Sequence, residues 1–307
     1  MNVLAVDIGG TKVRLGVVEV SETGTPVIRH QQDLETTGHQ LSEVLKNAAT
    51  LAEKLSGNLS YSKIGISTAG FLHEDRATID QLHDGRWIQT NIADFFGEPR
   101  DRVLVLDDGM ASTIAEWKSG AARQFSNTVV LTVGTKLGAG VVLNGRILHV
   151  GGYASPQLGG VIVPPEQARN KEIPFLGEEC AGDALRASAQ RCGYADVGDM
   201  LMRVKDDEKA AAAVERMCEY LAMCVANAVN LFAPERVVLT GGVVEKGREW
   251  VLHGVREHLE GKLLRRPRQF EATTALVEGK FGGNASLIGA ALAVFADPIE
   301  PRRDDSH

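Results

Sequence analysis

The pattern of apolar and polar positions divides the chain into short extended segments and longer helical ones. Alternating or continuous apolar runs predict strands at 2–8, 12–20, 63–67, 102–107, 128–133, 139–148 and 236–240. Apolar residues at helical spacing predict helices at 38–56, 109–121, 178–192, 207–232, 248–262 and 284–296. Strands come first in each half and helices follow. We therefore expect an α/β protein in which each half is a mixed sheet with helices on its faces.

A glycine-threonine-lysine turn occurs between two apolar runs in each half of the chain. The first copy contains Gly9, Gly10, Thr11 and Lys12, and the second contains Gly134, Thr135, Lys136 and Gly138. Turns without side chains place backbone N–H groups against an anion, and two of them are able to hold one nucleotide polyphosphate. An ordinary hairpin turn is the alternative for either copy alone, and the repetition favours the phosphate-binding interpretation. Lys136 either adds a cation near the phosphates or faces solvent.

A third glycine pair follows the predicted strand at 236–240. Gly241 and Gly242 come directly before an apolar segment and a helix. Close backbone approach at that point would admit an adenine or a ribose near the start of a helix, and a plain strand-to-helix turn fits equally well. No GxxxxGK[ST] string is present, and no GxGxxG string joins a strand to a helix, so the two most familiar phosphate-binding loops are excluded.

Asp108 is the candidate catalytic residue. It follows the strand at 102–107 and precedes the helix at 109–121, where a carboxylate points out from the edge of a sheet. Phosphoryl transfer requires a group that orients the attacking hydroxyl and accepts its proton. The alternative is that Asp107 or Asp108 only caps the following helix. The two carboxylates are also able to divide these roles, with Asp108 as the base and Asp107 as a substrate or capping ligand.

Composition narrows the class of partner. The 307 residues suffice for about two domains, and the net charge is −7 at pH 7. No long block of Lys or Arg occurs, which argues against binding to nucleic acid. Small molecules and other subunits are therefore the expected partners.

The cysteines and the absence of long apolar runs indicate the compartment. Cys180, Cys192, Cys218 and Cys224 match no metal or redox spacing, so we expect reduced and mostly buried thiols. No apolar run approaches the ~18 residues of a membrane span, and the first predicted strand carries Asp7 instead of following a basic leader. We expect a cytoplasmic protein with no membrane partner.

Five segments, taken in order, resemble the ROK family of bacterial sugar kinases and repressors. They lie at 7–12, 65–70, 107–111, 134–140 and 239–242. The resemblance covers residues 2 to about 295 and implies the actin-like, hexokinase-like ATPase fold: two ribonuclease-H-like domains with ATP and a sugar in the cleft between them. It implies one domain at 1–115, joined by the last helix at about 284–297, and a second domain at 116–283. A homodimer is the family expectation.

The same resemblance implies roles for the candidate residues. The two glycine turns, with Asp7, would hold the phosphates of ATP and Mg²⁺, and Gly241 and Gly242 would contact the adenosine. Asp108 would be the base that activates a sugar hydroxyl. The acceptor-side positions would be Gly70, Asp107, Gln157 and Glu178.

The departures from the family pattern fall on the acceptor side. The family usually has Asn-Asp where this chain has Asp107 and Asp108, and Gly-Glu-Ile-Gly-His where this chain has Gln157 and Gly160 at the Glu and His positions. The cysteine-rich zinc motif of the family is absent, because 161–176 contains no Cys or His. Cys180 alone cannot build a tetrahedral site, so we expect no structural zinc. Each lost partner of a buried sugar hydroxyl costs roughly 1 to 3 kcal/mol, so glucose does not follow as the acceptor.

Three functions remain in order of preference. The first is ATP-dependent phosphorylation of a hydroxyl on a sugar or sugar derivative. The second is a non-catalytic nucleotide or sugar sensor of the same fold, which the altered acceptor side supports. The third is a repressor of the family, which would carry an N-terminal helix-turn-helix, whereas here the first strand begins at residue 2.

Overall fold

The computed structural model describes most of the chain. The described residues are 1–21, 25–36, 40–56, 60–81, 87–150, 154–163, 175–263 and 275–295. They form two compact units. Unit 1 contains Met1–Ile114, Val142–Ser155 and Ser286–His307, and unit 2 contains Ala115–Val141 and Pro156–Ala285. The family domain boundaries given above stay a prediction.

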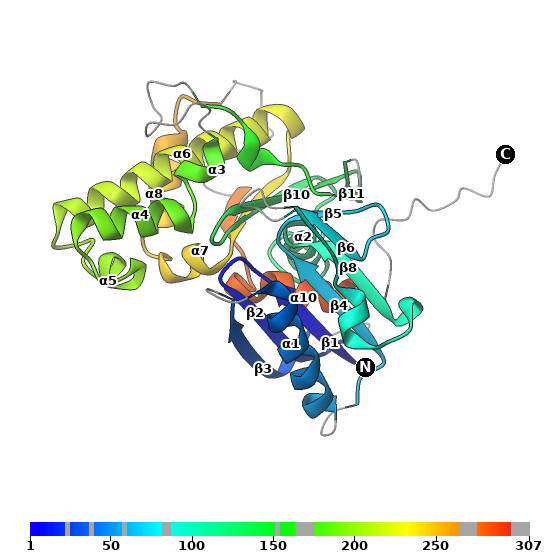
Figure 1. The fold of residues 1–307 in the computed structure, drawn as a ribbon. Helices are drawn as coiled ribbons and strands as arrows, with labels where there is room; N and C mark the ends of the chain where they lie inside the picture. Colours follow the sequence, from blue (N-terminus) through cyan, green and yellow to red (C-terminus); the bar gives the residue numbers. More distant parts are fainter. Residues whose placement is uncertain are drawn as a thin grey trace. The chain divides into compact units, whose positions relative to one another are not determined.

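The first sheet has the strand order β3-β2-β1-β4-β8 (Figure 1). Its strands are β1 (Asn2–Ile8), β2 (Lys12–Glu19), β3 (Val27–Glu35), β4 (Lys63–Thr68) and β8 (Val103–Asp107). β2 pairs antiparallel with β1 and β3, and β4 pairs parallel with β1 and β8. Because β1, β4 and β8 run parallel, their carboxyl ends lie along one edge of the sheet. The prediction missed β3, because most of its side chains are polar and exposed and leave no apolar alternation.

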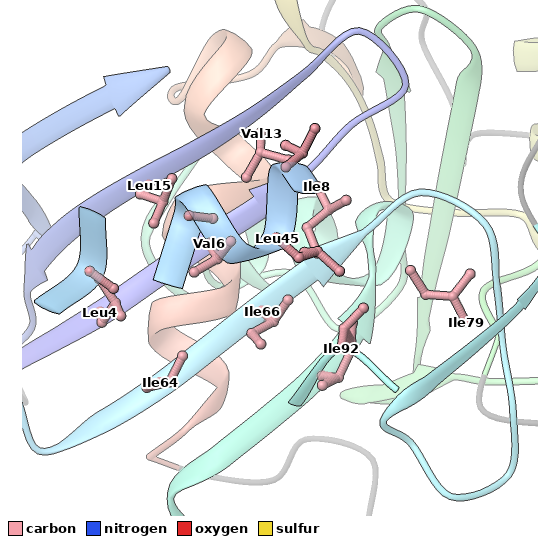
Figure 2. Packing of buried hydrophobic residues seen from close by; sticks show 14 of the residues in the cluster. Leu4, Val6, Ile8, Val13, Leu15, Leu45, Ile64, Ile66, Ile79 and Ile92 are labelled. Carbon is pink, nitrogen blue, oxygen red and sulfur yellow. The ribbon is translucent and has the colours of Figure 1, made fainter. Parts of the chain in front are cut away.

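Alternate residues of β1 face two different cores, as a strand buried on both sides requires. Leu4, Val6 and Ile8 pack with Leu45 of helix α1 (Leu41–Ser56) in the cluster that Figure 2 shows. Val3 and Ala5 belong to a second cluster, with residues of helix α10 (Ala285–Ala293). Helices thus cover both faces of the first sheet, which matches the predicted architecture.

The second sheet repeats the same strand order as β11-β10-β9-β12-β13. Its strands are β9 (Thr128–Val133), β10 (Leu137–Leu143), β11 (Arg146–Leu148), β12 (Arg236–Thr240) and β13 (Leu276–Glu278). β12 pairs parallel with β9 and β13. In each sheet the central strand enters a glycine turn and returns as its neighbour, so the sequence repeat is a repeat of structure. Asn144 and Gly145 both have positive φ, as a two-residue hairpin turn requires.

The remaining elements are a small sheet and a set of helices. The sheet contains β5 (Phe71–Leu72), β6 (Thr78–Gln81) and β7 (Trp87–Asn91). The helices are α2 (Asp108–Ser119), α3 (Leu176–Glu179), α4 (Gly182–Cys192), α5 (Val197–Met202), α6 (Glu208–Phe232), α7 (Gly242–Lys246) and α8 (Val251–Leu259). Among the described residues, no helix combines the length and the apolar character that a bilayer crossing requires.

Two helix predictions and the cysteine prediction have clear outcomes. The single helix predicted at 178–192 is wrong, because the chain breaks at Cys180 and Ala181 between α3 and α4. The helix predicted at 207–232 is confirmed as α6, and one face of it, with Leu221 and Val225, is fully buried. All four cysteines are free thiols and three of them are buried, as predicted.

Leu45→Ala tests the packing of α1 on the first sheet. Leu45 has no exposed surface, so the truncation removes buried methyl groups and leaves a cavity. We expect the free energy of unfolding to fall by about 2 to 5 kcal/mol, measured by urea denaturation. Lys46→Ala, at an exposed position of the same helix, is the control. Equal effects of the two substitutions would contradict this packing.

Candidate active site

The first glycine turn of unit 1 directs its amide groups outwards. Gly9 closes the turn by donating its N–H to the carbonyl of Lys12 at 2.9 Å. Thr36 donates its N–H to the carbonyl of Thr11 and its hydroxyl to that of Gly10, each at 3.1 Å. Within the part of the chain that the structure describes, the N–H groups of Gly10 and Thr11 donate to no protein acceptor. Two adjacent donors without a partner are suited to an anion.

In the second turn, in unit 2, the first amides of a helix bind the carbonyl groups. Gly134 donates to the carbonyl of Lys136 at 3.0 Å. The first amides of α4 bind the other carbonyls: Gly182 donates to Gly134 at 2.8 Å and Asp183 to Thr135 at 3.0 Å. A Cβ at Gly182 would lie 2.7 Å from the Gly134 oxygen, so only glycine fits there. Among the described residues, nothing accepts from the N–H groups of Thr135 and Lys136.

The lysines of the two turns each pair with an aspartate of their own unit. Lys12 Nζ lies 2.5 Å from Asp33 Oδ2, and Lys136 Nζ lies 3.2 Å from Asp183 Oδ2. Both lysine side chains stay about 40% exposed. Lys136 is therefore partly exposed to solvent, and it forms an ion pair of the weak, exposed kind. Sequence reasoning found neither aspartate, because each is distant from its turn along the chain.

The third glycine segment lies beside the second turn. β12 ends next to β9, and a Cβ at Gly241 would lie 2.6 Å from the carbonyl oxygen of Val133, the residue before Gly134. Gly241 also has a φ of 100°, which favours glycine. It donates its N–H to the carbonyl of Gly282 at 3.2 Å. Gly282 belongs to a further Gly-Gly pair at 282–283, which the sequence analysis did not single out.

Three carboxylates of unit 1 gather at the carboxyl edge of the first sheet. Asp7 lies near the end of β1, Asp107 ends β8, and Asp108 begins α2. The register places Asp7 opposite Ser67 and Asp107 opposite Thr68 on the two sides of β4. Parallel strands that end together explain why residues about 100 positions apart share one edge.

The side chain of Asp107 accepts hydrogen bonds from the start of α2 and from Ser155. Its Oδ1 accepts the N–H of Met110 at 2.8 Å and so caps α2. Its Oδ2 accepts the N–H of Ser155 at 2.9 Å and the Ser155 hydroxyl at 2.7 Å. Every one of these partners is a donor, which an acceptor-only carboxylate satisfies better than the amide of asparagine. Asp107 therefore caps α2, and its role as a substrate ligand stays a prediction.

Asp108 has a different environment. Its side chain is partly exposed, whereas Asp107 is buried. Desolvation raises the pKa of Asp108 well above its usual range, and the negative charges of Asp107 and Asp7 raise it further. Desolvation also raises the pKa of Asp7 to about 6, against the opposing effects of Arg14 and Ser67. Crowded carboxylates with raised pKa values are typical of sites that bind a cation or move a proton.

The acceptor-side candidates fall into two groups. Gly70 follows β4 with a φ of 110° and stands at the same edge as Asp107 in unit 1. In unit 2, Gln157 is exposed directly before a short turn of helix at Leu158–Gly160, and Glu178 is half-buried in α3. These two elements contact each other, since a Cβ on Gly177 would lie 3.1 Å from Gly159. Gly138 lies inside β10, one residue after its start.

No group of three His, Cys, Asp or Glu side chains suited to a metal ion occurs among the described residues. The absence of structural zinc stays a prediction. Part of the segment on which it rests, 164–174, lies outside the described residues.

A duplicated sheet with a glycine turn after each central strand, and carboxylates at the edge of one sheet, is the arrangement of actin-like ATPases. The ROK glucokinase of Streptomyces griseus, solved with glucose and AMPPNP, has this fold. It matches with a TM-score of 0.81 and 22% identity, covering 95% of this chain and 98% of its own.

The sequence comparisons identify the family. The ROK family profile matches residues 3–296. A glucokinase of Halalkalibacterium halodurans is 24% identical over 325 residues, covering 95% of this chain and 94% of the relative. An N-acetylmannosamine kinase of Haemophilus influenzae is 28% identical over 305 residues, with the same coverage. The chain belongs to the ROK family, and the resemblance drawn from its motifs is confirmed.

The raised pKa of Asp7 gives a prediction about stability. The pKa of Asp7 is about 6 in the folded protein, above its ordinary value of 3.8. The folded protein therefore binds more protons than the unfolded chain between about pH 4 and pH 6. Stability from this group is therefore lost as the pH rises through that window. We expect Asp7→Asn to raise the melting temperature relative to wild type at about pH 8, with the difference vanishing near pH 4.

The control for this experiment is Asp94→Asn, at an exposed position of the same unit. It should give no pH-dependent difference in melting temperature. A destabilisation by Asp7→Asn that grows with pH would contradict the raised pKa.

Proposed function

We propose that this chain transfers the γ-phosphoryl group of ATP to a hydroxyl of a sugar or sugar derivative, with Asp108 as the general base. The observation that carries the proposal is the division of labour between Asp107 and Asp108. Asp107 spends both oxygens on the helix cap and Ser155. Asp108, at the same edge, is a partly exposed residue. Its pKa is raised towards the range in which a base works efficiently.

Both units supply groups for the nucleotide. Unit 1 offers the amides of Gly10 and Thr11, and unit 2 offers those of Thr135 and Lys136. We propose that these donors bind phosphate oxygens. Lys12 and Lys136 would then exchange their exposed carboxylate partners for phosphate, at little cost because such ion pairs are weak. Gly241 and Gly242 would contact the adenosine, as the family resemblance implies.

We propose that Mg²⁺ binds at the edge of the first sheet. Carboxylate oxygens are the ligands that this ion prefers. Burial raises the pKa of both Asp7 and Asp108, and the charges of Asp107 and Asp7 raise that of Asp108 further. A bound cation would favour the charged form of both groups. Asp7 would hold it, directly or through water. A bound Mg²⁺ would neutralise negative charge that develops during transfer. Asp108 then has to be ionised to accept the proton of the acceptor hydroxyl.

The acceptor belongs to the hexoses or their N-acetylated derivatives in this proposal. Relatives of this chain carry the names glucokinase and N-acetylmannosamine kinase. We propose that Gly70, Gln157 and Glu178 contact the acceptor. Asp107 would shape the acceptor side through Ser155, and its direct contact with substrate stays a prediction. The exchange of Glu for Gln157 on this side favours a preference different from that for glucose.

Assembly and compartment are part of the same proposal. We propose a homodimer in the cytoplasm whose partners are small molecules and not nucleic acids or membranes. Size-exclusion chromatography with light scattering tests the dimer, and a single species at 33 kDa, the mass of one chain, would contradict it.

Asp108→Asn tests the catalytic role. The amide keeps the size of the side chain but cannot accept the proton, so we expect kcat to fall by about 10²- to 10⁴-fold. Nucleotide affinity should change little. The measurement is coupled ATP consumption with glucose, N-acetylmannosamine, amino sugars and ketoses, followed by calorimetry with a non-hydrolysable ATP analogue.

Asp101→Asn, at an exposed position of unit 1, controls for removal of a carboxylate and should leave kcat unchanged. Near-normal turnover of Asp108→Asn would remove Asp108 from the mechanism. A wild type that binds nucleotide but phosphorylates no member of the panel would favour the non-catalytic sensor instead.

A further inference from the structure

Glu116 is a fully buried carboxylate in the second half of α2, and its partners are all in unit 2. Oε2 accepts the N–H groups of Ala121 at 2.9 Å and Lys280 at 3.0 Å. Oε1 accepts the N–H of Phe281 at 3.0 Å and the hydroxyl of Thr240 at 3.3 Å. A charge with no exposed surface is costly unless it is satisfied, and here three amides and one hydroxyl satisfy it.

These hydrogen bonds join three separate parts of the fold. Ala121 follows the end of α2, Thr240 ends β12, and Lys280 and Phe281 belong to the segment after β13. Glu116 therefore ties Lys280 and Phe281 to the carboxyl end of β12. It acts together with the backbone bonds from Gly279 to Leu239 and from Gly241 to Gly282.

The segment that Glu116 holds carries a second pair of glycines beside the predicted adenosine contact. Gly241 donates to the carbonyl of Gly282 at 3.2 Å, and Gly283 donates to Glu245 of α7 at 2.9 Å. A Cβ on Gly283 would lie 3.6 Å from Cα of Gly242. We call Gly241, Gly242, Gly282 and Gly283 the double-glycine surface.

The double-glycine surface has an open side. A Cβ on Gly242 would meet no atom within 4 Å. A flat ring is thus able to approach the backbone there without meeting side chains. Gly241 contacts Val133, the residue directly before the second glycine turn. A ligand with a planar end and a phosphate end therefore fits the order of these segments.

We propose that Glu116 is a positioning residue of the nucleotide site, which holds Gly282 and Gly283 beside Gly241 and Gly242 so that the four glycines together bind the nucleoside end of ATP. This inference rests on the proposed function for the identity of the nucleotide. It adds Gly282 and Gly283 to the binding residues and assigns a task to a buried acid that takes no part in the chemistry.

The substitution Glu116→Gln separates this role from simple packing. Glutamine keeps the shape but replaces one acceptor oxygen by an NH₂ donor, which must then face an N–H group of Ala121, Lys280 or Phe281. At least one of these bonds is lost, which weakens the attachment of the segment at 279–284. We expect the Kd of a non-hydrolysable ATP analogue to rise about tenfold, and KM for ATP to rise with it, while kcat and KM for the acceptor stay within about twofold.

Glu235→Gln is the matched control. Glu235 also accepts two backbone N–H groups, from Ser126 and Asn127, but it does so at the opposite end of β12. It should leave nucleotide affinity unchanged. Equal weakening by the two substitutions, or an unchanged Kd in folded Glu116→Gln, would overturn the inference.

Thr240→Val decides the matter if Glu116→Gln does not fold. It removes only the hydroxyl that contacts Glu116 and the carbonyl of Gly282, so nucleotide binding should weaken in the same direction but less. An unchanged Kd in Thr240→Val would then overturn the inference. Because the readout is binding without acceptor, a wild type that binds nucleotide but phosphorylates no sugar contradicts only the proposed function. A wild type that binds no nucleotide contradicts both.

Discussion

The orientation of backbone amides in two tight turns is the constraint on which the rest of this structure depends. In both turns the carbonyl groups are bonded to other segments, while adjacent N–H groups have no acceptor among the described residues. Thr36 binds those carbonyls in unit 1, and the first amides of α4 bind them in unit 2. The second arrangement explains the break between α3 and α4, because α4 has to begin where its first N–H groups reach the turn. It also explains why position 182 is glycine. Elements far from each turn in the sequence are therefore part of its function.

The carboxylates of unit 1 follow a complementary logic. Burial raises the pKa of both Asp7 and Asp108, and the negative charges of Asp107 and Asp7 raise that of Asp108 further. Asp107 is bound by three donors and stabilises the start of α2, whereas Asp108 stays partly exposed. Amides without a protein acceptor in each turn suit a polyphosphate. The carboxylates at the edge of the first sheet suit a divalent cation and a hydroxyl that must lose a proton.

The sequence predicted the parts whose signals are local. The glycine turns and the central strands carry their own chemistry in adjacent residues. Polar β3 lacked that signal, and β13 has only three residues, so both were missed. The hydrogen bonds of Asp107 could not be predicted, because its partner Ser155 is 48 positions away along the chain. The aspartates that pair with Lys12 and Lys136, and the glycine segment that Glu116 holds, likewise depend on contacts between distant parts of the chain.

The central claim is that both turns bind the phosphates of the same nucleotide, and amide chemical shifts test it most directly. The wild-type chain would be titrated with a non-hydrolysable ATP analogue and Mg²⁺, and separately with adenosine. The account predicts that the analogue shifts the amides of Gly10, Thr11, Thr135 and Lys136 together, with one affinity. Adenosine, which has no phosphates, should affect only the double-glycine surface. Shifts confined to one turn, or equal shifts with adenosine, would contradict the account.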